Sequence, residues 1–129
     1  MLGIKYFIYI RKLNLTCMSN SGLYKGSLTT IILKLLAESE RMYGYEITQK
    51  VKELTRGKLK ITEGALYPSL HKLEAEGILE VEVVKVDNRM RKYYRLTRKG
   101  TRETAAKLSE LEEFLQTLQG ILKPNPGLN

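Results

Sequence analysis

Apolar side chains recur along residues 28–36 with the period of a helix. They occupy positions i, i+3, i+4, i+7 and i+8, a pattern typical of an amphipathic helix packed on a core. These positions are Leu28, Ile31, Ile32, Leu35 and Leu36. Ser27 comes directly before them and has the side chain of an N-cap. The pattern therefore predicts a first helix that begins after Ser27.

A polar break, ESERMYG, occupies residues 38–44. Beyond it, Ile47, Val51 and Leu54 share one helical face and predict a second helix at about 44–54, with all three side chains inward. The basic segment TRGKLK, centred on Gly57, then predicts a turn.

The third predicted helix lies within TEGALYPSLHKLEAEG, residues 62–77. Its leucines are spaced by four and then three, so they line one face, and they are Leu66, Leu70 and Leu73. Thr62 is a suitable N-cap, and Gly77 a suitable end.

Pro68 interrupts this third helix. A proline inside a helix lacks an N–H donor, and its ring crowds the residue four positions earlier. That residue is Gly64, which has no side chain to add to the crowding. Two interpretations follow: a continuous helix that contains Pro68, or a regular helix that begins near Pro68 after a looser turn at 62–67.

Two strands follow the third helix. Apolar and acidic residues alternate from Leu79 to Val83, as in a half-buried strand. The alternation shifts at Val84, which predicts a bulge or a strong twist there. Asp87 and Asn88 both tolerate unusual backbone angles, so they predict the turn before a second strand in RMRKYYRLT.

A long last helix is predicted from Thr97 to about Leu122, where KPNPG would end it. The fold class is therefore mainly α with a small antiparallel β-hairpin: a winged helix-turn-helix plus a long C-terminal helix. The expected divisions are an N-terminal extension at 1–22, the winged helix-turn-helix at 23–97, a dimerisation helix at 98–122 and a tail at 123–129.

Composition narrows the class of protein. A chain of 129 residues is long enough for one modest core, and its net charge of +8 favours an acidic partner such as nucleic acid. The single cysteine, Cys17, excludes an internal disulfide, and the single histidine, His71, argues against a histidine-built metal centre. No catalytic constellation accompanies His71, so we expect neither an enzyme nor a cofactor.

The N-terminal segment MLGIKYFIYIRKLNLTCMSNSG is apolar but is interrupted by Lys5, Arg11 and Lys12. No apolar run in it approaches the roughly 20 residues that cross a bilayer, so we expect no membrane partner and a cytoplasmic protein. One interpretation is an appended strand or helix that covers apolar surface. The other is that Met18 is the functional start.

Basic residues are concentrated in residues 85–102, which hold eight of them against one acidic residue, Asp87. A solvated charged face normally mixes signs, so this stretch favours binding to a polyanion, here double-stranded DNA. We expect Arg89, Arg91 and Lys92 in the wing to contact phosphates.

The outward face of the third helix combines small residues with hydrogen-bonding side chains, as a helix lying in the major groove requires. The expected DNA-binding residues of this segment are Thr62, Glu63, Ala65, Tyr67, Ser69, His71 and Lys72. Two alternatives remain: Tyr67 packs against the hairpin instead, and His71 is an ordinary exposed histidine.

Leucines in the last helix are spaced 3, 4, 3 and 4, the repeat of a coiled-coil seam. They are Leu108, Leu111, Leu115, Leu118 and Leu122, and Phe114 and Ile121 widen the apolar face. We expect this seam to form a homodimer. Burial against the core of the same chain is the alternative.

Four segments, in this order and spacing, resemble the PadR family of transcriptional regulators: GSLTTIILKLLAES, YGYEI, ITEGALYPSLHKLEAEG and RKYYRLTRKG. The resemblance covers about residues 24–122 and is closest to the compact branch with a single C-terminal helix. It departs in the wing, where Asp87-Asn88 replaces a glycine-rich turn and Met90 stands at a position often taken by proline.

The resemblance implies a dimeric winged-helix protein, usually a repressor, whose third helix and wing contact an operator. It also implies that a small aromatic effector can release DNA, and we expect such a ligand near Leu28, Ile32, Leu35 and Phe114. The alternative functions are a winged-helix protein-interaction module and a non-specific architectural DNA binder.

Overall fold

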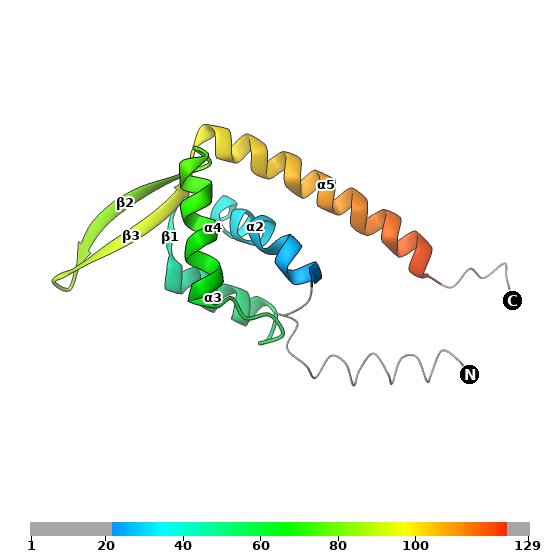
Figure 1. The fold of residues 1–129 in the computed structure, drawn as a ribbon, viewed down its shortest axis with the longest axis horizontal. Coiled ribbons are helices and arrows are strands. Elements are labelled where there is room, and N and C mark those ends of the chain that lie inside the picture. The colour runs from blue at the N-terminus through cyan, green and yellow to red at the C-terminus, as the bar shows by residue number, and fades with distance from the viewer. Residues whose placement is uncertain (1–21, 124–129) are drawn as a thin grey trace, which may run out of the picture.

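A computed structural model of the chain describes residues 22–123. The elements in chain order are α2 (Gly22–Ala37), β1 (Met42–Tyr43), α3 (Gly44–Leu54), α4 (Glu63–Ala75), β2 (Leu79–Val86), β3 (Arg89–Leu96) and α5 (Arg98–Leu122). The three strands form one antiparallel sheet in the order β1-β3-β2. This is the predicted winged helix-turn-helix with a long last helix (Figure 1). The roles expected for the N-terminal extension and for the KPNPG stop concern residues that lie, apart from Gly22 and Lys123, outside the described range.

The first helix, α2, begins earlier than predicted. It starts at Gly22, so Ser27 lies inside the helix and is not its N-cap. The reason is Tyr24, whose ring is buried and whose hydroxyl donates a hydrogen bond to the Lys60 carbonyl over 3.2 Å. These tertiary contacts stabilise an additional turn that the apolar periodicity does not require.

The predicted polar break contains a strand, β1. Met42 is buried, and β1 pairs with β3 through Met42↔Tyr94 and Tyr43↔Tyr93. A strand of two residues is too short to give an alternating pattern, so the sequence offers no signal for it.

Helix α3 has the predicted bounds, and Ile47 and Val51 are buried as expected. The prediction for Leu54 was wrong, because its side chain is 62% exposed. Leu54 is the last residue of α3, directly before a turn in which Arg56 and Gly57 both have positive φ. It shares the face of Val51 but lies past the edge of the core.

Helix α4 is continuous through Pro68, so the alternative of a looser turn at 62–67 does not occur. The Thr62 side chain caps it by accepting a hydrogen bond from the Ala65 N–H. Its three leucines are buried as predicted, and they are Leu66, Leu70 and Leu73. No other part of the structure approaches within 4 Å of the position that a Cβ would occupy on Gly64. The helix thus accommodates the ring of Pro68 on an open, solvent-facing side.

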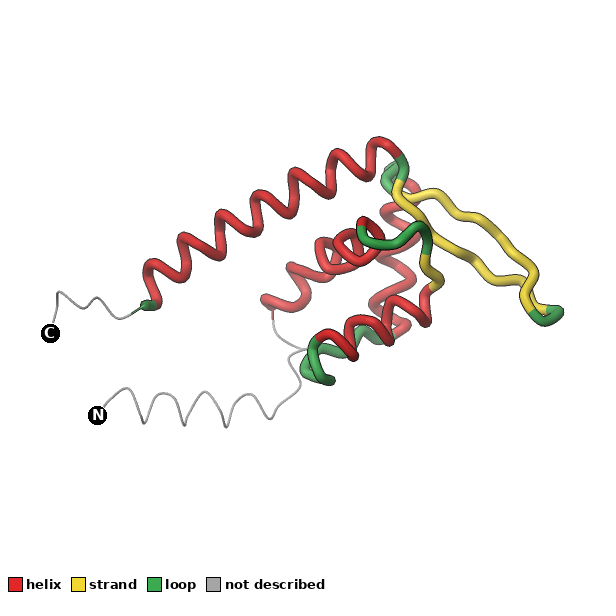
Figure 2. Tube along the Cα trace, turned by 180° about the vertical axis from the view of Figure 1, so that it is seen from behind, coloured by secondary structure: helices red, strands yellow, loops and turns green. Residues whose placement is uncertain are grey.

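The hairpin of β2 and β3 has a continuous register from Leu79↔Leu96 to Val86↔Arg89, so the bulge expected at Val84 is absent. The hairpin joins the core at its base, where Leu79 and Tyr94 are buried, and its outer part projects beyond the helices (Figures 1 and 2). Val83 accordingly is 51% exposed. Apolar residues occur on both faces of this outer part because it has no core to cover. The shift in alternation at Val84 therefore needs no inserted residue to explain it. The turn is as predicted, with positive φ at Asp87 and Asn88.

Helix α5 is anchored to the turn between α4 and β2 by Thr97. Its hydroxyl donates to the carbonyl oxygens of Gly77, at 2.6 Å, and Ile78, at 3.1 Å, and accepts from the Gly100 N–H. A Cβ on Gly100 would lie 2.0 Å from the Ile78 carbonyl oxygen. The contact therefore requires glycine at position 100. From this anchor α5 runs over α2 and extends away from the wing (Figure 1).

Residues from all three short helices and from the sheet form one core, with Ile32, Ile47, Leu66 and Tyr94 at its centre. None of the described helices is long and apolar enough to cross a bilayer.

Candidate nucleic-acid interface

Of the predicted DNA-binding residues in this segment, Tyr67, His71 and Lys72 lie on the side of α4 that faces away from its buried leucines. The exposed ones are Thr62, Glu63, Tyr67, His71 and Lys72, while Ala65 and Ser69 are half-buried. The Ser69 hydroxyl donates to the Ala65 carbonyl over 3.1 Å, which uses its one proton within the helix. Ser69 is therefore available to a base edge mainly as an acceptor.

Tyr67 lies on this face, but part of its ring contacts α3. A Cβ on Gly44 would be 2.7 Å from the Tyr67 hydroxyl oxygen and 3.0 Å from Cζ. Tyr67 thus packs on the first residue of α3, yet it remains 38% exposed. The His71 ring lies beside it, with ring centroids 6.4 Å apart.

The predicted wing residues divide between the two faces of β3. Arg89 and Arg91 are on one face and Lys92 on the other, because side chains alternate along a strand. Arg89 and Lys92 are exposed, whereas Arg91 is half-buried. The wing therefore presents basic groups on both sides of its ribbon.

Arg91 lies against an aromatic cluster at the base of the wing. Its guanidinium carbon is 4.0 Å from the centroid of the Tyr43 ring. The pKa of Arg91 lies above its ordinary value, chiefly because the guanidinium hydrogen-bonds Tyr93. Tyr43 in turn packs edge-on to Tyr93, at 5.5 Å, and is stacked with Tyr45, at 6.4 Å.

A second arginine occupies the same sheet face. The Arg41 guanidinium lies 4.4 Å from the centroid of Tyr93 and donates to Glu82 over 2.8 Å. Sequence reasoning missed this cluster of Arg41, Tyr43, Tyr45 and Tyr93. The only available signal was the aromatic content of YGY and KYY, which does not indicate that β1 pairs with β3.

Part of the basic excess at 85–102 is neutralised by cross-strand pairing. Arg95 lies opposite Glu80 and donates to its carboxylate over 2.6 Å. Within α5, Lys99 lies 4.0 Å from the Glu103 carboxylate and also donates to the Glu76 carbonyl over 2.8 Å. Lys85, Arg89 and Lys92 are exposed toward the wing tip, and Arg98 and Arg102 are exposed at the start of α5.

The leucine seam of α5 is only partly covered within the protomer. Leu108, Leu111 and Leu118 are half-buried, whereas Leu115 and Leu122 are 47% and 68% exposed. Phe114 and Ile121 beside the seam are also exposed. The described residues therefore do not bury the whole seam in the core of the same chain.

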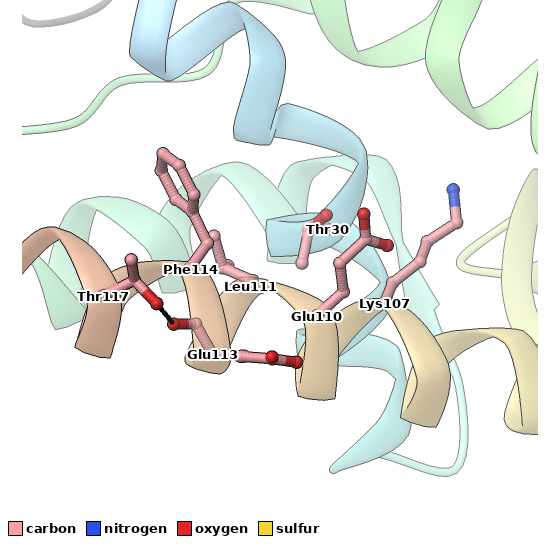
Figure 3. A pocket seen from close by; sticks show the side chains of 7 residues that line it. All are labelled: Thr30, Lys107, Glu110, Leu111, Glu113, Phe114 and Thr117. Atoms are coloured by element: carbon pink, nitrogen blue, oxygen red, sulfur yellow. Dashed lines mark hydrogen bonds between the residues drawn. The ribbon is translucent and has the colours of Figure 1, made fainter.

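A groove of about 520 Å³ lies between α2 and α5. Figure 3 shows Leu111 and Phe114 extending from α5 on the side that faces α2, which carries Thr30. Lys107, Glu110, Glu113 and Thr117 complete its lining. Of the residues expected near a ligand, Phe114 lines this groove. Leu28, Ile32 and Leu35 do not, because all three are buried in the core of the protomer.

Residues 32–106 match the Transcriptional regulator PadR-like family. Uncharacterized protein X from Lysinibacillus sphaericus is 40% identical over 95 residues, which are 73% of this chain and 83% of that protein. Transcriptional regulator Rv3488 from Mycobacterium tuberculosis is 38% identical over 89 residues, 69% of this chain and 79% of that protein.

Solved structures give the same result. A transcriptional regulator from Clostridium thermocellum is 31% identical, with a TM-score of 0.73, and the match covers 80% of this chain and 100% of the other. A PadR-like transcription factor from Bacteroides fragilis is 35% identical with a TM-score of 0.65, over 77% of this chain and 93% of the other.

Proposed function

The chain belongs to the PadR-like family of transcriptional regulators, and we propose that it binds a specific operator as a homodimer and represses transcription there. Membership makes it a DNA-binding regulator with a winged-helix fold and not an enzyme. The operator, the dimer and the repression are the parts that we infer.

The observation that carries the proposal is the pairing of an exposed helix face with a basic wing. In α4, the outward side chains of Tyr67, His71 and Lys72 are of the kinds that reach base edges and phosphates. Thr62 and Glu63 begin the helix, and helix N-termini commonly approach the DNA backbone. Half-buried Ala65 and Ser69 complete the proposed surface by permitting close approach.

In the wing, Arg89, Arg91 and Lys92 are proposed to contact phosphates. The hairpin projects past the helices (Figure 2). In the proposed complex this brings its basic side chains to the DNA backbone beside the groove entered by α4. Their contribution is electrostatic and independent of sequence, so it falls as salt increases.

The exposed seam on α5 supports a homodimer. Burying Leu115, Leu122 and Phe114 against a second copy would remove apolar surface from water at roughly 25 cal/mol per Å². A symmetric pair of α5 helices also places two copies of α4 on one duplex. We expect a pseudo-palindromic operator whose half-sites are about 34 Å apart.

The groove between α2 and α5 is proposed to receive a small aromatic effector. Phe114 offers a ring for stacking, and Lys107 and Glu110 offer charged groups to orient the ligand. A ligand there changes DNA affinity only if it binds one arrangement of the two heads better than the other. In a dimer, the second copy competes for this groove.

The proposal is tested with purified full-length protein and sheared genomic DNA from its own source. Selection of bound fragments should return one inverted repeat, and light scattering should give twice the mass of 14.8 kDa. Placing that repeat over a promoter should lower transcription when the protein is present. Recovery of random fragments would instead favour an architectural binder, and absence of DNA binding would favour a protein-interaction module.

A further inference from the structure

Two neighbouring residues between β1 and α3 contact the two proposed DNA-binding elements separately. Tyr43 lies under the Arg91 guanidinium of the wing, at 4.0 Å from ring centroid to guanidinium carbon. Gly44 lies under the ring of Tyr67 in α4, where a Cβ would come within 2.7 Å of the hydroxyl oxygen. The wing and the recognition helix are thus connected through one dipeptide.

Tyr43 is held firmly enough to serve as a platform. Its backbone pairs with Tyr93 on β3, and its ring packs edge-on to the ring of that residue, at 74°. Tyr45 stacks on it from α3 at an interplanar angle of 20°. The platform therefore belongs to the sheet and to α3 at once, so its position relative to α4 is fixed by the core.

Stacking on this platform leaves the edge of the guanidinium for another partner. The five N–H donors of arginine lie in the guanidinium plane, whereas the contact with a ring uses the face of that plane. An arginine stacked in this way loses less conformational freedom when its edge binds a phosphate. Arg91 has this arrangement over the ring of Tyr43.

Arg41 provides a contrast on the same sheet face. It also stacks on a tyrosine, Tyr93, but it donates to the Glu82 carboxylate over 2.8 Å. Its charge is neutralised within the protein, so it gains little from a phosphate. Arg41 is the matched control for Arg91.

On the basis of the proposed DNA binding, we propose that Tyr43 and Gly44 are positioning residues. Together they hold the wing and the recognition helix in the positions in which both contact DNA. Tyr43 orients the Arg91 guanidinium toward a phosphate. Gly44 leaves the space in which Tyr67 reaches its place on the DNA-facing side of α4. The two residues act on different parts of recognition, so their variants have different signatures.

The Tyr43→Leu variant removes the platform and keeps an apolar side chain. We expect operator and random DNA to be bound about 2–5-fold more weakly, the range of an exposed cation–π contact. The slope of log affinity against log salt should fall by about one, as it should in Arg91→Ala. Combining Tyr43→Leu with Arg91→Ala should add nothing further, and Tyr43→Phe, which keeps the ring, should restore wild-type binding. Arg41→Ala should leave the slope unchanged.

The Gly44→Ala variant displaces Tyr67 instead. We expect it to weaken operator binding about tenfold, within the range for a lost base contact, with a smaller effect on random DNA and an unchanged salt slope. In a Tyr67→Leu background, which lacks the hydroxyl and ring, Gly44→Ala should have little further effect.

The outcomes separate this inference from the proposed function. Wild-type protein that binds no DNA would refute both. DNA binding by the wild type with an unchanged salt slope in Tyr43→Leu, or with additive losses in the Tyr43–Arg91 pair, would overturn the positioning role alone. Tyr43→Phe and Tyr43→Leu must both fold with the same pairing of β1 and β3. Comparing their DNA affinities therefore tests the role of the Tyr43 ring even if Gly44→Ala does not fold.

Discussion

Replacing Gly100 with alanine tests the junction that directs α5. A Cβ at this position would lie 2.0 Å from the Ile78 carbonyl oxygen and 3.0 Å from the carbonyl carbon. Contacts of this kind do not occur between real atoms, so α5 must move away from the turn between α4 and β2 by about 1 Å or more. The Thr97 hydrogen bonds to Gly77 and Ile78, at 2.6 and 3.1 Å, span the same gap.

The size of the effect follows from three contributions. Overpacking against backbone costs about 1–3 kcal/mol. Weakening the two Thr97 hydrogen bonds costs about 0.5–1.5 kcal/mol each. Alanine is favoured over glycine within a helix by about 1 kcal/mol, which offsets part of this. We therefore expect Gly100→Ala to lower the free energy of unfolding by about 1–5 kcal/mol.

The same helix contains the matched control. Gly120 also lies in α5, and among residues 22–123 no atom beyond its own stretch of helix backbone lies within 4 Å of a Cβ added there. Gly120→Ala should raise the free energy of unfolding by up to about 1 kcal/mol, the helix-propensity gain alone.

Urea unfolding followed by circular dichroism, at one fixed protein concentration, measures both variants. The concentration is fixed because the stability of a dimer depends on it. Gly100→Ala should also weaken operator binding, since a displaced α5 changes the distance between the two winged-helix domains of the proposed dimer. If Gly100→Ala is as stable as the wild type, α5 does not approach the Ile78 carbonyl this closely, and the junction does not require glycine at position 100.

The remaining predictions concern the seam, the core and the wing. Replacing Leu111 and Leu115 together with lysine should give a monomer by light scattering, because charge cannot be buried cheaply in an apolar interface, and a persisting dimer would contradict the seam. Thr104→Val should raise the free energy of unfolding by about 1 kcal/mol, since the buried Thr104 hydroxyl has no hydrogen-bond partner among the described residues; a loss of stability would mean that it finds one in the dimer. Burial raises the pKa of Tyr94 above its ordinary value, so the unfolded chain loses this proton first as pH rises. The stabilisation is present below about pH 10 and lost above it, and urea titrations should show a smaller alkaline loss in Tyr94→Phe. Arg89→Ala should weaken binding to all DNA alike and lower the salt slope by about one, measured by fluorescence anisotropy; altered sequence preference would contradict a phosphate contact.

Periodicity in the sequence was enough to predict most elements of the fold. Burial of one face imposes a period on each element, so Leu66, Leu70 and Leu73 indicated the face of α4 without knowledge of its partners. Local backbone chemistry was equally readable, because Thr62, Thr97 and Asp87-Asn88 act within a few residues of themselves. The departures occur where an element is short or ends. Leu54 has the right phase but extends past the core, and β1 is too short to have a phase.

The features of the candidate site also divide into those that the sequence predicts and those that depend on contacts between segments. The charge of the wing and the outward residues of α4 are properties of single segments, so the sequence by itself determined them. Which cations are neutralised depends on pairing between segments: Arg95 meets Glu80 only because β2 and β3 share a register.

Only the tertiary structure decided how the two DNA-binding elements are joined. Tyr43 and Arg91 are far apart in the chain and meet because β1 lies beside β3. Gly44 and Tyr67 meet because α3 packs against α4 over the common core. A contact between distant segments has no period and no local backbone preference, so it leaves no pattern in one sequence. It arises when packing brings the two surfaces together.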